Sequence, residues 1–227
     1  MMHYELDICT LSSKNVPNRT LYGEVMKVRT KARRESIVSE ATNLFCENGF
    51  ERTSMSEIAK QLGGSKTTLY NYFPSKEALF EAVVENIGVV HLDPALKKLL
   101  ESTDLEIKEI LIQFGEVILS LINQADALAV YRMVIGEAGR SDIGLLFYKI
   151  GPHRVNDAAR EFITNAIKNG GLRACDPEVA ASHLLSLIKS ESDQNLFKCS
   201  PPILKKSEIR EMVTRAVDVF IAAYSAR

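Results

Sequence analysis

Residues 53–76 read TSMSEIAKQLGGSKTTLYNYFPSK, and this stretch decides the fold that we expect. Ser54 followed by Glu57 has the spacing of a capping box, which starts a helix. Gly63-Gly64 then ends that helix, because glycine adopts the left-handed backbone that a sharp turn needs. Between these signals, apolar residues recur at i, i+3, i+4 and i+7, at Met55, Ile58, Ala59 and Leu62.

A second short helix follows the turn. Ser65 can cap it, and Leu69 and Phe73, four residues apart, point inward. The remaining side chains face water: Ser65, Lys66, Thr67, Thr68, Tyr70, Asn71 and Tyr72. Hydroxyls, an amide, a cation and phenols on one face suit hydrogen bonding to a polar partner. We therefore predict a helix-turn-helix whose second helix reads a DNA major groove.

The charge distribution agrees with this prediction. The chain has 227 residues and a formal net charge of −1, yet residues 26–76 hold nine Lys or Arg against five Glu. Four of these cations, Arg29, Lys31, Arg33 and Arg34, precede the helix-turn-helix and are expected to contact phosphate. The alternative is that this arm is only a solvated run of charges. A basic head on an acidic body suits a protein that meets nucleic acid with one end.

The rest of the chain predicts helices only. From Arg29, an apolar stripe indicates a first helix to about Asn48; another starts near Ser75 and reaches Ile87, and a short one runs from Pro94 to Leu100. Further helical patterns end at residues 122, 137, 150, 169, 197 and 225. No segment alternates as a strand does, so the expected fold class is all-α.

Residues 1–28 have no clear period and are expected to form a poorly ordered extension. Met26 is a possible second translation start. We expect a three-helix DNA-binding head over residues 29–75 and a helical body over 76–227. The sequence lacks a signal peptide and an apolar run near the roughly 18 residues of a membrane span, so no membrane contact and a cytoplasmic location are expected.

Residues 53–80, including SKTTLYNYFPSKEALF, resemble the N-terminal signature of the TetR/AcrR family of transcriptional regulators. One departure is Gly64, where that family more often has a small branched residue. The resemblance implies a homodimeric regulator, most often a repressor, with a palindromic operator in double-stranded DNA. It also implies a small-molecule effector in the body, which shifts the linking helix over residues 75–90 and changes the separation of the two reading heads.

Residues 125–199 resemble the regulatory domain of one branch of that family. The resemblance lies in YRMVIGEA (131–138), FYKIGP (147–152), Gly170-Gly171-Leu172 and DPEVAASHLL (176–185). It implies a dimer interface formed by helices over 177–197 and 207–225. Apolar stripes agree with this, at Leu184, Leu185, Leu187, Ile188, Val213, Val217 and Phe220. The alternative is that these stripes pack inside one protomer.

Individual contacts can be assigned from the pattern. Lys66, Thr67, Thr68, Tyr70 and Asn71 are candidates at base edges; Thr53, Tyr72 and Lys76 are candidates at phosphates, and Ser54 and Ser65 start the two helices beside the DNA. An effector cavity could be lined by Phe114, Ile118, Tyr131, Met133, Glu137, Phe147 and Tyr148. Aromatic and methionine residues at helical spacing are also ordinary core residues, so this set has a purely structural alternative.

Other chemistry finds no support in the sequence. There is no G-x-S-x-G, phosphate-binding loop or dinucleotide fingerprint, so we predict no enzyme activity and no cofactor. The four cysteines and four histidines form no paired metal-ligand spacing, so no metal is expected; Cys46 is interpreted as a small buried apolar residue. Two alternative functions stay open: an enzyme domain fused to a vestigial head, and a regulator whose body binds another protein. Activation rather than repression stays open as well.

Overall fold

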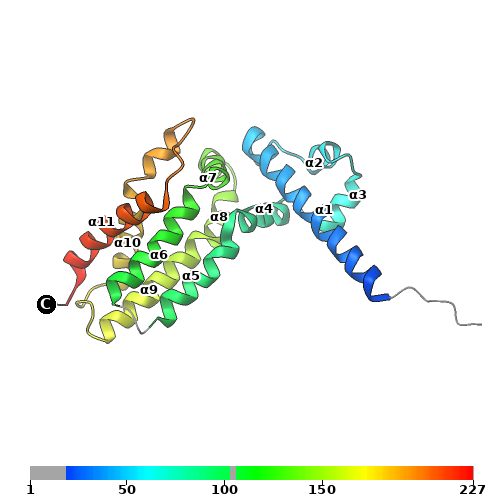
Figure 1. The fold of residues 1–227 in the computed structure, drawn as a ribbon. Coiled ribbons are helices and arrows are strands. Elements are labelled where there is room, and N and C mark those ends of the chain that lie inside the picture. Colours follow the sequence, from blue (N-terminus) through cyan, green and yellow to red (C-terminus); the bar gives the residue numbers. More distant parts are fainter. Residues whose placement is uncertain (1–18, 103–105, 227) are drawn as a thin grey trace, which may run out of the picture. The chain divides into compact units, whose positions relative to one another are not determined.

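The computed structural model describes residues 19–102 and 106–226. These residues form helices and contain no β-strand beyond two isolated bridges, Ala138–Ser141 and Leu172–Ser225 (Figure 1). The expected all-α fold is confirmed.

Helix α1 (Arg19–Asn48) begins ten residues before its expected start at Arg29. The prediction of an irregular extension over residues 1–28 is therefore wrong for residues 19–28, whereas residues 1–18 lie outside the described residues. Extending a formed helix costs little, because each added residue gains a hydrogen bond. No proline occurs between Pro17 and the end of α1 at Asn48. By internal contacts the chain divides between Ser36 and Ile37, so the two parts are described separately.

From Ile37 onward, the second half of α1 packs with α2 (Met55–Gln61), α3 (Lys66–Tyr72) and α4 (Lys76–Val84). Three rings form the centre of this core. The Phe45 and Phe50 centroids are 5.3 Å apart, and the Phe80 centroid lies 6.1 Å from Phe45 and 5.5 Å from Phe50. The predicted inward positions are confirmed, since Ile58 and Leu69 are buried.

Local signals set the ends of α2, α3 and α4. The hydroxyls of Ser54, Ser65 and Ser75 accept hydrogen bonds from the third amide of each following helix, at 3.1, 3.1 and 3.0 Å. Gly63 has φ 61°, and the Gly64 amide donates to the Ala59 carbonyl at 3.0 Å. This is the Schellman pattern, which satisfies the last carbonyls of α2. The turn thus fixes the direction in which α3 leaves.

The link after α4 differs from the expectation. A π-helical segment, η1 (Glu85–Val89), follows α4, and Gly88 within it has φ 130° and ψ 12°. Helix α5 (Val90–Glu101) then begins four residues before Pro94, which we expected to start it. Only glycine adopts such a positive φ readily, so the kink at Gly88 separates the two helices. Pro94 lies just beyond the first turn of α5, where it removes a single helical hydrogen bond.

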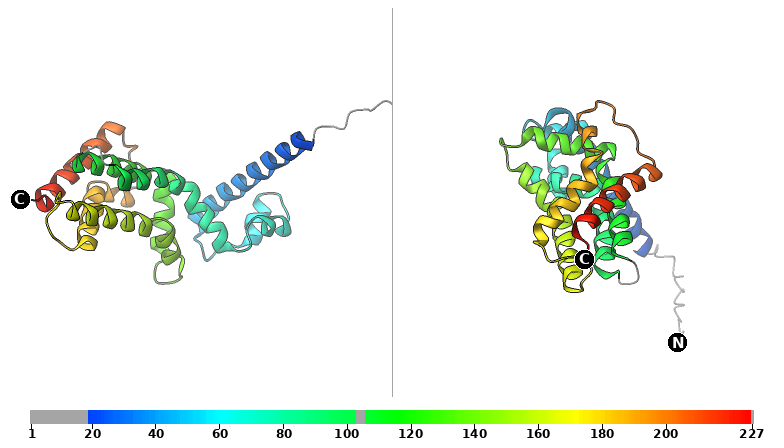
Figure 2. Two further views of the ribbon diagram at one scale, coloured as in Figure 1. Left: turned by 90° about the horizontal axis from the view of Figure 1, so that it is seen from below. Right: turned by 90° about the vertical axis from the view of Figure 1, so that its left-hand side faces the viewer.

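The body surrounds α6 (Ile107–Ile122), which packs against α5, α10 (Pro177–Ser190) and α11 (Lys206–Tyr224) (Figures 1 and 2). Helix α9 (Pro152–Lys168) packs against α5, α10 and α8 (Ile143–Ile150). Helix α7 (Ala125–Glu137) completes the body with the 3-10 helix η2 (Asp193–Phe197). Leu111, Leu119 and Ile163 are fully buried at its centre.

The stripes offered as evidence for a dimer lie inside one protomer. The side chains concerned are at most 1% exposed, or are half-buried against the same core: Leu184, Ile188, Val213, Val217, Phe220, Leu185 and Leu187. The internal-packing alternative is therefore correct for the five fully buried residues, Leu184, Ile188, Val213, Val217 and Phe220. The helix expected over 177–197 also stops at Ser190, because a turn at Ser192, whose hydroxyl donates to the Lys189 carbonyl at 3.1 Å, leads into η2. The helix expected over 207–225 corresponds to α11.

The two cores meet across α4, α7 and α8. Met133, Val134 and Ile143 belong to the cluster that contains Phe80 and Leu79, and α4 packs against α8. The division at residues 75 and 76 stays a prediction. Among the described residues no single helix is long and apolar enough to cross a bilayer; α6 and α7 pass that test only together, with a bend of 72° between them.

Candidate nucleic-acid interface and internal cavity

The outward face of α3 carries the predicted base-reading side chains. Leu69 alone in α3 is buried, whereas six neighbouring side chains are exposed: Ser65, Lys66, Thr67, Thr68, Tyr70 and Asn71. The Lys66 ammonium lies 5.8 Å from the centroid of the Tyr70 ring. The structure therefore brings this predicted set together on one short, solvent-exposed surface.

The two serines at helix starts have backbone partners. Ser54 Oγ accepts from the Glu57 amide, and Ser65 Oγ accepts from the Thr68 amide at 3.1 Å each. Ser65 Oγ also lies 2.9 Å from Thr68 Oγ1. Both serines are exposed, and both set the position of a helix.

Two of the predicted phosphate contacts, Thr53 and Lys76, have intramolecular partners in the structure. Thr53 is 1% exposed, and its hydroxyl is directed to the carbonyls of Gly49 at 2.8 Å and Leu44 at 3.1 Å, so it closes the end of α1. The Lys76 ammonium donates to the Phe50 carbonyl at 2.9 Å and lies 4.3 Å from the centroid of the Phe50 ring. These groups satisfy the protein's own backbone. Tyr72 is half-buried against the head core.

The basic arm lies in the part of α1 before Ile37 and is described by itself. Lys31 and Arg34 are exposed and Arg33 is half-buried; the Arg29 side chain is outside the described set. Lys31 Nζ lies 3.9 Å from Glu35 Oε1, with both side chains more than half exposed. Exposed side chains are expected both for an arm that contacts phosphate and for a solvated run of charges, so their exposure does not separate these two interpretations.

A cavity of about 350 Å³ lies in the body and reaches the link from α4 to α5. Most of its wall is apolar, including Val84, Ile87, Leu92, Ile118, Tyr131 and Phe147. The Tyr131 and Phe147 rings are 5.7 Å apart, centroid to centroid. The lining therefore joins the end of α4 to α6, α7 and α8.

Helix α10 and η2 supply the charged residues of the cavity lining. Helix α10 contributes Ser182, Leu185, Ser186 and Lys189, and η2 contributes Asp193. These residues are not among the predicted effector residues. Their signal is the spacing i, i+3, i+4 and i+7, which places three polar residues on one face of an otherwise apolar helix.

The predicted effector residues divide among several places. Ile118, Tyr131 and Phe147 line the 350 Å³ cavity. Phe114 lines a separate groove of about 610 Å³ between α5, α6 and α11. Met133 is buried in the core shared by α4 and α7.

The last two members of that set lie at other contacts. The Glu137 carboxylate Oε1 lies 2.6 Å from the position that a Cβ atom on Gly49 would take, at the end of α1. Tyr148 is 43% exposed, and its hydroxyl accepts from Asn156 Nδ2 at 3.5 Å. Sequence periodicity could not separate these seven residues, because the α7–α8 region borders both the cavity and the head core.

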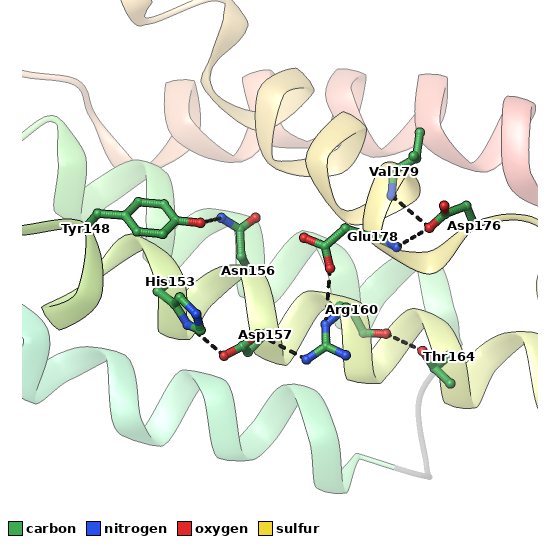
Figure 3. A network of polar contacts seen from close by, with 9 residues as sticks. All are labelled: Tyr148, His153, Asn156, Asp157, Arg160, Thr164, Asp176, Glu178 and Val179. Atoms are coloured by element: carbon green, nitrogen blue, oxygen red, sulfur yellow. Dashed lines mark hydrogen bonds and ion pairs between the residues drawn. The ribbon is translucent and has the colours of Figure 1, made fainter. Parts of the chain in front are cut away.

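The outer surface near the cavity has a network of charges on α9 and α10 (Figure 3). Asp157 contacts His153 Nδ1 at 2.7 Å and Arg160 Nη2 at 3.1 Å. Arg160 Nε lies 3.3 Å from Glu178 Oε2 on α10. These groups are exposed, so the network contributes little stability and mainly aligns the two helices.

Helix η2 is held against the cavity by Arg132 of α7. The Arg132 guanidinium donates to the carbonyls of Leu196 at 2.8 Å and of Asn195 and Lys198 at 2.7 Å each. The buried Asn195 amide donates to Asn123 Oδ1 at 2.9 Å. These charge-assisted hydrogen bonds satisfy the backbone carbonyls at the end of η2. They also hold η2 in place as part of the cavity wall.

Two other kinds of site, a reactive thiol at Cys46 and a metal cluster, are considered among the described residues. Burial raises the pKa of the Cys46 thiol to about 11, and Asp126 and Glu47 add to the rise, so the reactive thiolate is disfavoured. Among the described residues no group of three or more His, Cys, Asp or Glu side chains is placed to hold a metal ion.

Comparison with known proteins agrees with this arrangement. The family model for bacterial regulatory proteins of the tetR family matches residues 37–83, and the model for the AefR-like transcriptional repressor, C-terminal domain, matches residues 109–226. Among curated proteins, Escherichia coli K12 RutR is 44% identical over 63 residues, and Mannheimia succiniciproducens SlmA is 42% identical over 65 residues. Each alignment covers 28% of this chain and 30% of the relative.

Solved structures extend the likeness to both parts of the fold. A putative TetR-family regulator from Mesorhizobium loti is 26% identical with a TM-score of 0.70, covering 87% of this chain and 99% of that one. The flavonoid-responsive regulator FrrA is 31% identical with a TM-score of 0.67, covering 86% and 99%. The chain belongs to the TetR family of DNA-binding transcriptional regulators.

Proposed function

We propose that this protein is a cytoplasmic, homodimeric repressor that binds a palindromic operator and leaves it when a small molecule enters the 350 Å³ cavity. The observation that carries the proposal is the outward face of α3, where six polar side chains surround a single buried leucine, Leu69. Such a face on the second helix of a helix-turn-helix fits base edges in the major groove.

Direct contacts are proposed for the exposed residues only. Lys66, Thr67, Thr68, Tyr70 and Asn71 would meet bases, and Arg29, Lys31, Arg33 and Arg34 would meet phosphate, together with Ser54, Ser65 and Tyr72 beside the helices. Thr53 and Lys76 would hold the head together instead, because their polar groups face backbone carbonyls.

The cavity supports coupling between effector and DNA. Val84, Ile87 and Leu92 line it, and they stand on α4, η1 and α5. The first turns of α4 carry Leu79 and Phe80 into the head core. A ligand that displaces Val84 or Ile87 would therefore move α4 about the kink at Gly88. Heads that must reach grooves about 34–36 Å apart would lose register.

The dimer interface is proposed on the outward faces of α10 and α11. Val179 and Val219 are 47% and 56% exposed there, and Ala222 beside them is exposed as well. Small and apolar residues on two neighbouring helices allow close approach of a second copy. The core residues Leu184 and Phe220 support each protomer from within.

The effector class can be approached through a relative. FrrA is flavonoid-responsive by name, and the alignment covers 86% of this chain and 99% of FrrA, which supports an apolar aromatic effector here. The cavity volume lies in the range of about 300–1,000 Å³ that small-molecule sites occupy, which favours a small ligand over a protein partner for this body.

A footprint on genomic fragments around the protein's own gene tests the proposal. We expect protection of a short inverted repeat, with affinity that falls steeply as salt rises, because phosphate contacts release counter-ions. Variant Asn71→Ala should lose the footprint at equal protein concentration, whereas Lys168→Ala, on the exposed end of α9, should keep it. Weak binding that is blind to sequence and equal in both variants would refute a specific reading head.

A further inference from the structure

We propose that the effector is an amphipathic anion, a molecule with an apolar body and one acidic group that meets Lys189. This inference rests on the proposed function, because it takes the cavity lined by α10 to be the effector site. It adds the chemical class of the ligand and the residue that selects it.

The position of Lys189 is the first argument. Its side chain lines the cavity and is half-buried, and among the described residues no carboxylate lies within ion-pair distance of its ammonium. Glu191, the nearest acid on the same segment, accepts from Arg215 Nε at 2.9 Å and Nη2 at 2.6 Å. A cation that is partly removed from water without a counter-ion is costly, so an anion entering the cavity gains a favourable partner.

The rest of the lining defines the apolar body. Tyr131 and Phe147 form an aromatic pair in the lining, and Val84 and Leu92 add aliphatic side chains to it. Ser182 lies one helical turn before Ser186 and two turns before Lys189 on α10, and it adds a hydroxyl to the lining. The ligand that matches this asymmetry buries a flat or aliphatic body and keeps its charge at α10.

Asp193 is the counter-argument within the same lining. Its carboxylate on η2 also borders the cavity and would repel an anion. It is exposed, whereas Lys189 is half-buried, so solvent screens the acid more strongly than the base. The net preference is therefore for negative charge, and removal of Asp193 should increase it.

The experiment uses the full-length protein and three probes with one apolar body: 2-naphthoate, 2-naphthalenemethanol and 2-naphthylmethylammonium. Isothermal titration calorimetry should give about tenfold tighter binding for the anion than for the alcohol, as expected for a charge-assisted hydrogen bond. Lys189→Met should remove that advantage, and Asp193→Asn should strengthen naphthoate binding. Lys168→Met, which changes a lysine outside the cavity, is the matched control.

Several results would overturn the inference. These are equal affinity for the three probes, tightest binding of the cation, binding of none, or naphthoate binding that Lys189→Met leaves unchanged. Operator titrations of the same preparations report on the proposed function separately. Specific operator binding with any of those four results would refute the anionic class alone, whereas naphthoate selection by Lys189 without operator binding would refute the regulator alone.

Discussion

Lys76 Nζ donates to the carbonyl of Phe50 at 2.9 Å, across 26 positions of sequence, and lies over the Phe50 ring at 4.3 Å from its centroid. This contact ties the first residue of α4 to the turn between α1 and α2. The cation that sequence analysis assigned to DNA therefore holds the head core to the linking helix.

Lys76→Met should lower the free energy of unfolding by about 1.5–3 kcal/mol, because a charged hydrogen bond and a cation–π contact are lost. Urea unfolding measures this change, and Lys168→Met should alter stability by less than about 0.5 kcal/mol. If the variant is as stable as the parent but binds the operator more weakly, Lys76 contacts phosphate and does not stabilise the head.

Thr53→Val keeps the shape of a buried side chain and removes its hydroxyl. We expect a loss of about 1–2 kcal/mol, because carbonyls of Leu44 and Gly49 lose a donor. The dependence of operator affinity on salt should keep its slope, since no phosphate contact is lost. A shallower slope with unchanged stability would contradict the internal role.

Lys66→Ala should weaken specific operator binding by about tenfold without changing stability, since the side chain is exposed and a good base contact contributes about 1–3 kcal/mol. Titration against the footprinted operator and against a scrambled duplex separates specific from general binding. Lys168→Ala serves as the charge-matched control. Unchanged discrimination between the two duplexes would remove Lys66 from the reading surface.

At Gly115, α6 lies close to α10 and α11. A Cβ atom there would lie 2.6 Å from Val213 Cγ1 and 3.3 Å from Ile188 Cδ1, so Gly115→Ala should cost about 1–3 kcal/mol through overpacking. Gly136→Ala, in α7 with no atom within 4 Å, should be neutral or stabilising by helix propensity. Thermal unfolding compares the two. Rescue of Gly115→Ala by Val213→Ala would identify the contact, and equal effects of the two glycine changes would refute it.

Acid should weaken the contact between α10 and α11. The hydrogen bond from Arg215 lowers the pKa of Glu191 in the folded state. The stability that this pair contributes is therefore fully present at pH values above the ordinary carboxyl pKa of 4.5. That contribution is lost as pH falls through the lowered folded value. Glu191→Gln should therefore flatten the stability profile below pH 4.5, measured by urea unfolding at several pH values. Because both side chains are largely exposed, we expect a small effect; an unchanged profile would refute the linkage.

The sequence by itself determined the helix class, the helix-turn-helix and its outward face. Each depends on neighbours in the chain: the serine caps at 54, 65 and 75, the glycine at 63, and the period that buries Ile58 and Leu69 while exposing Lys66 and Asn71. Interactions over three or four residues leave a direct pattern in sequence.

Tertiary structure decided what such patterns leave open. Apolar stripes at Leu184 and Val217 could have met a second copy or the same protomer, and only packing against α6 assigned them to the inside. Thr53 and Lys76 are polar residues whose partners Leu44 and Phe50, nine and 26 positions away in sequence, become neighbours through the fold of the head. The cavity likewise needs nine helical elements at once, so its wall at Lys189 is set by contacts between helices that no local period encodes.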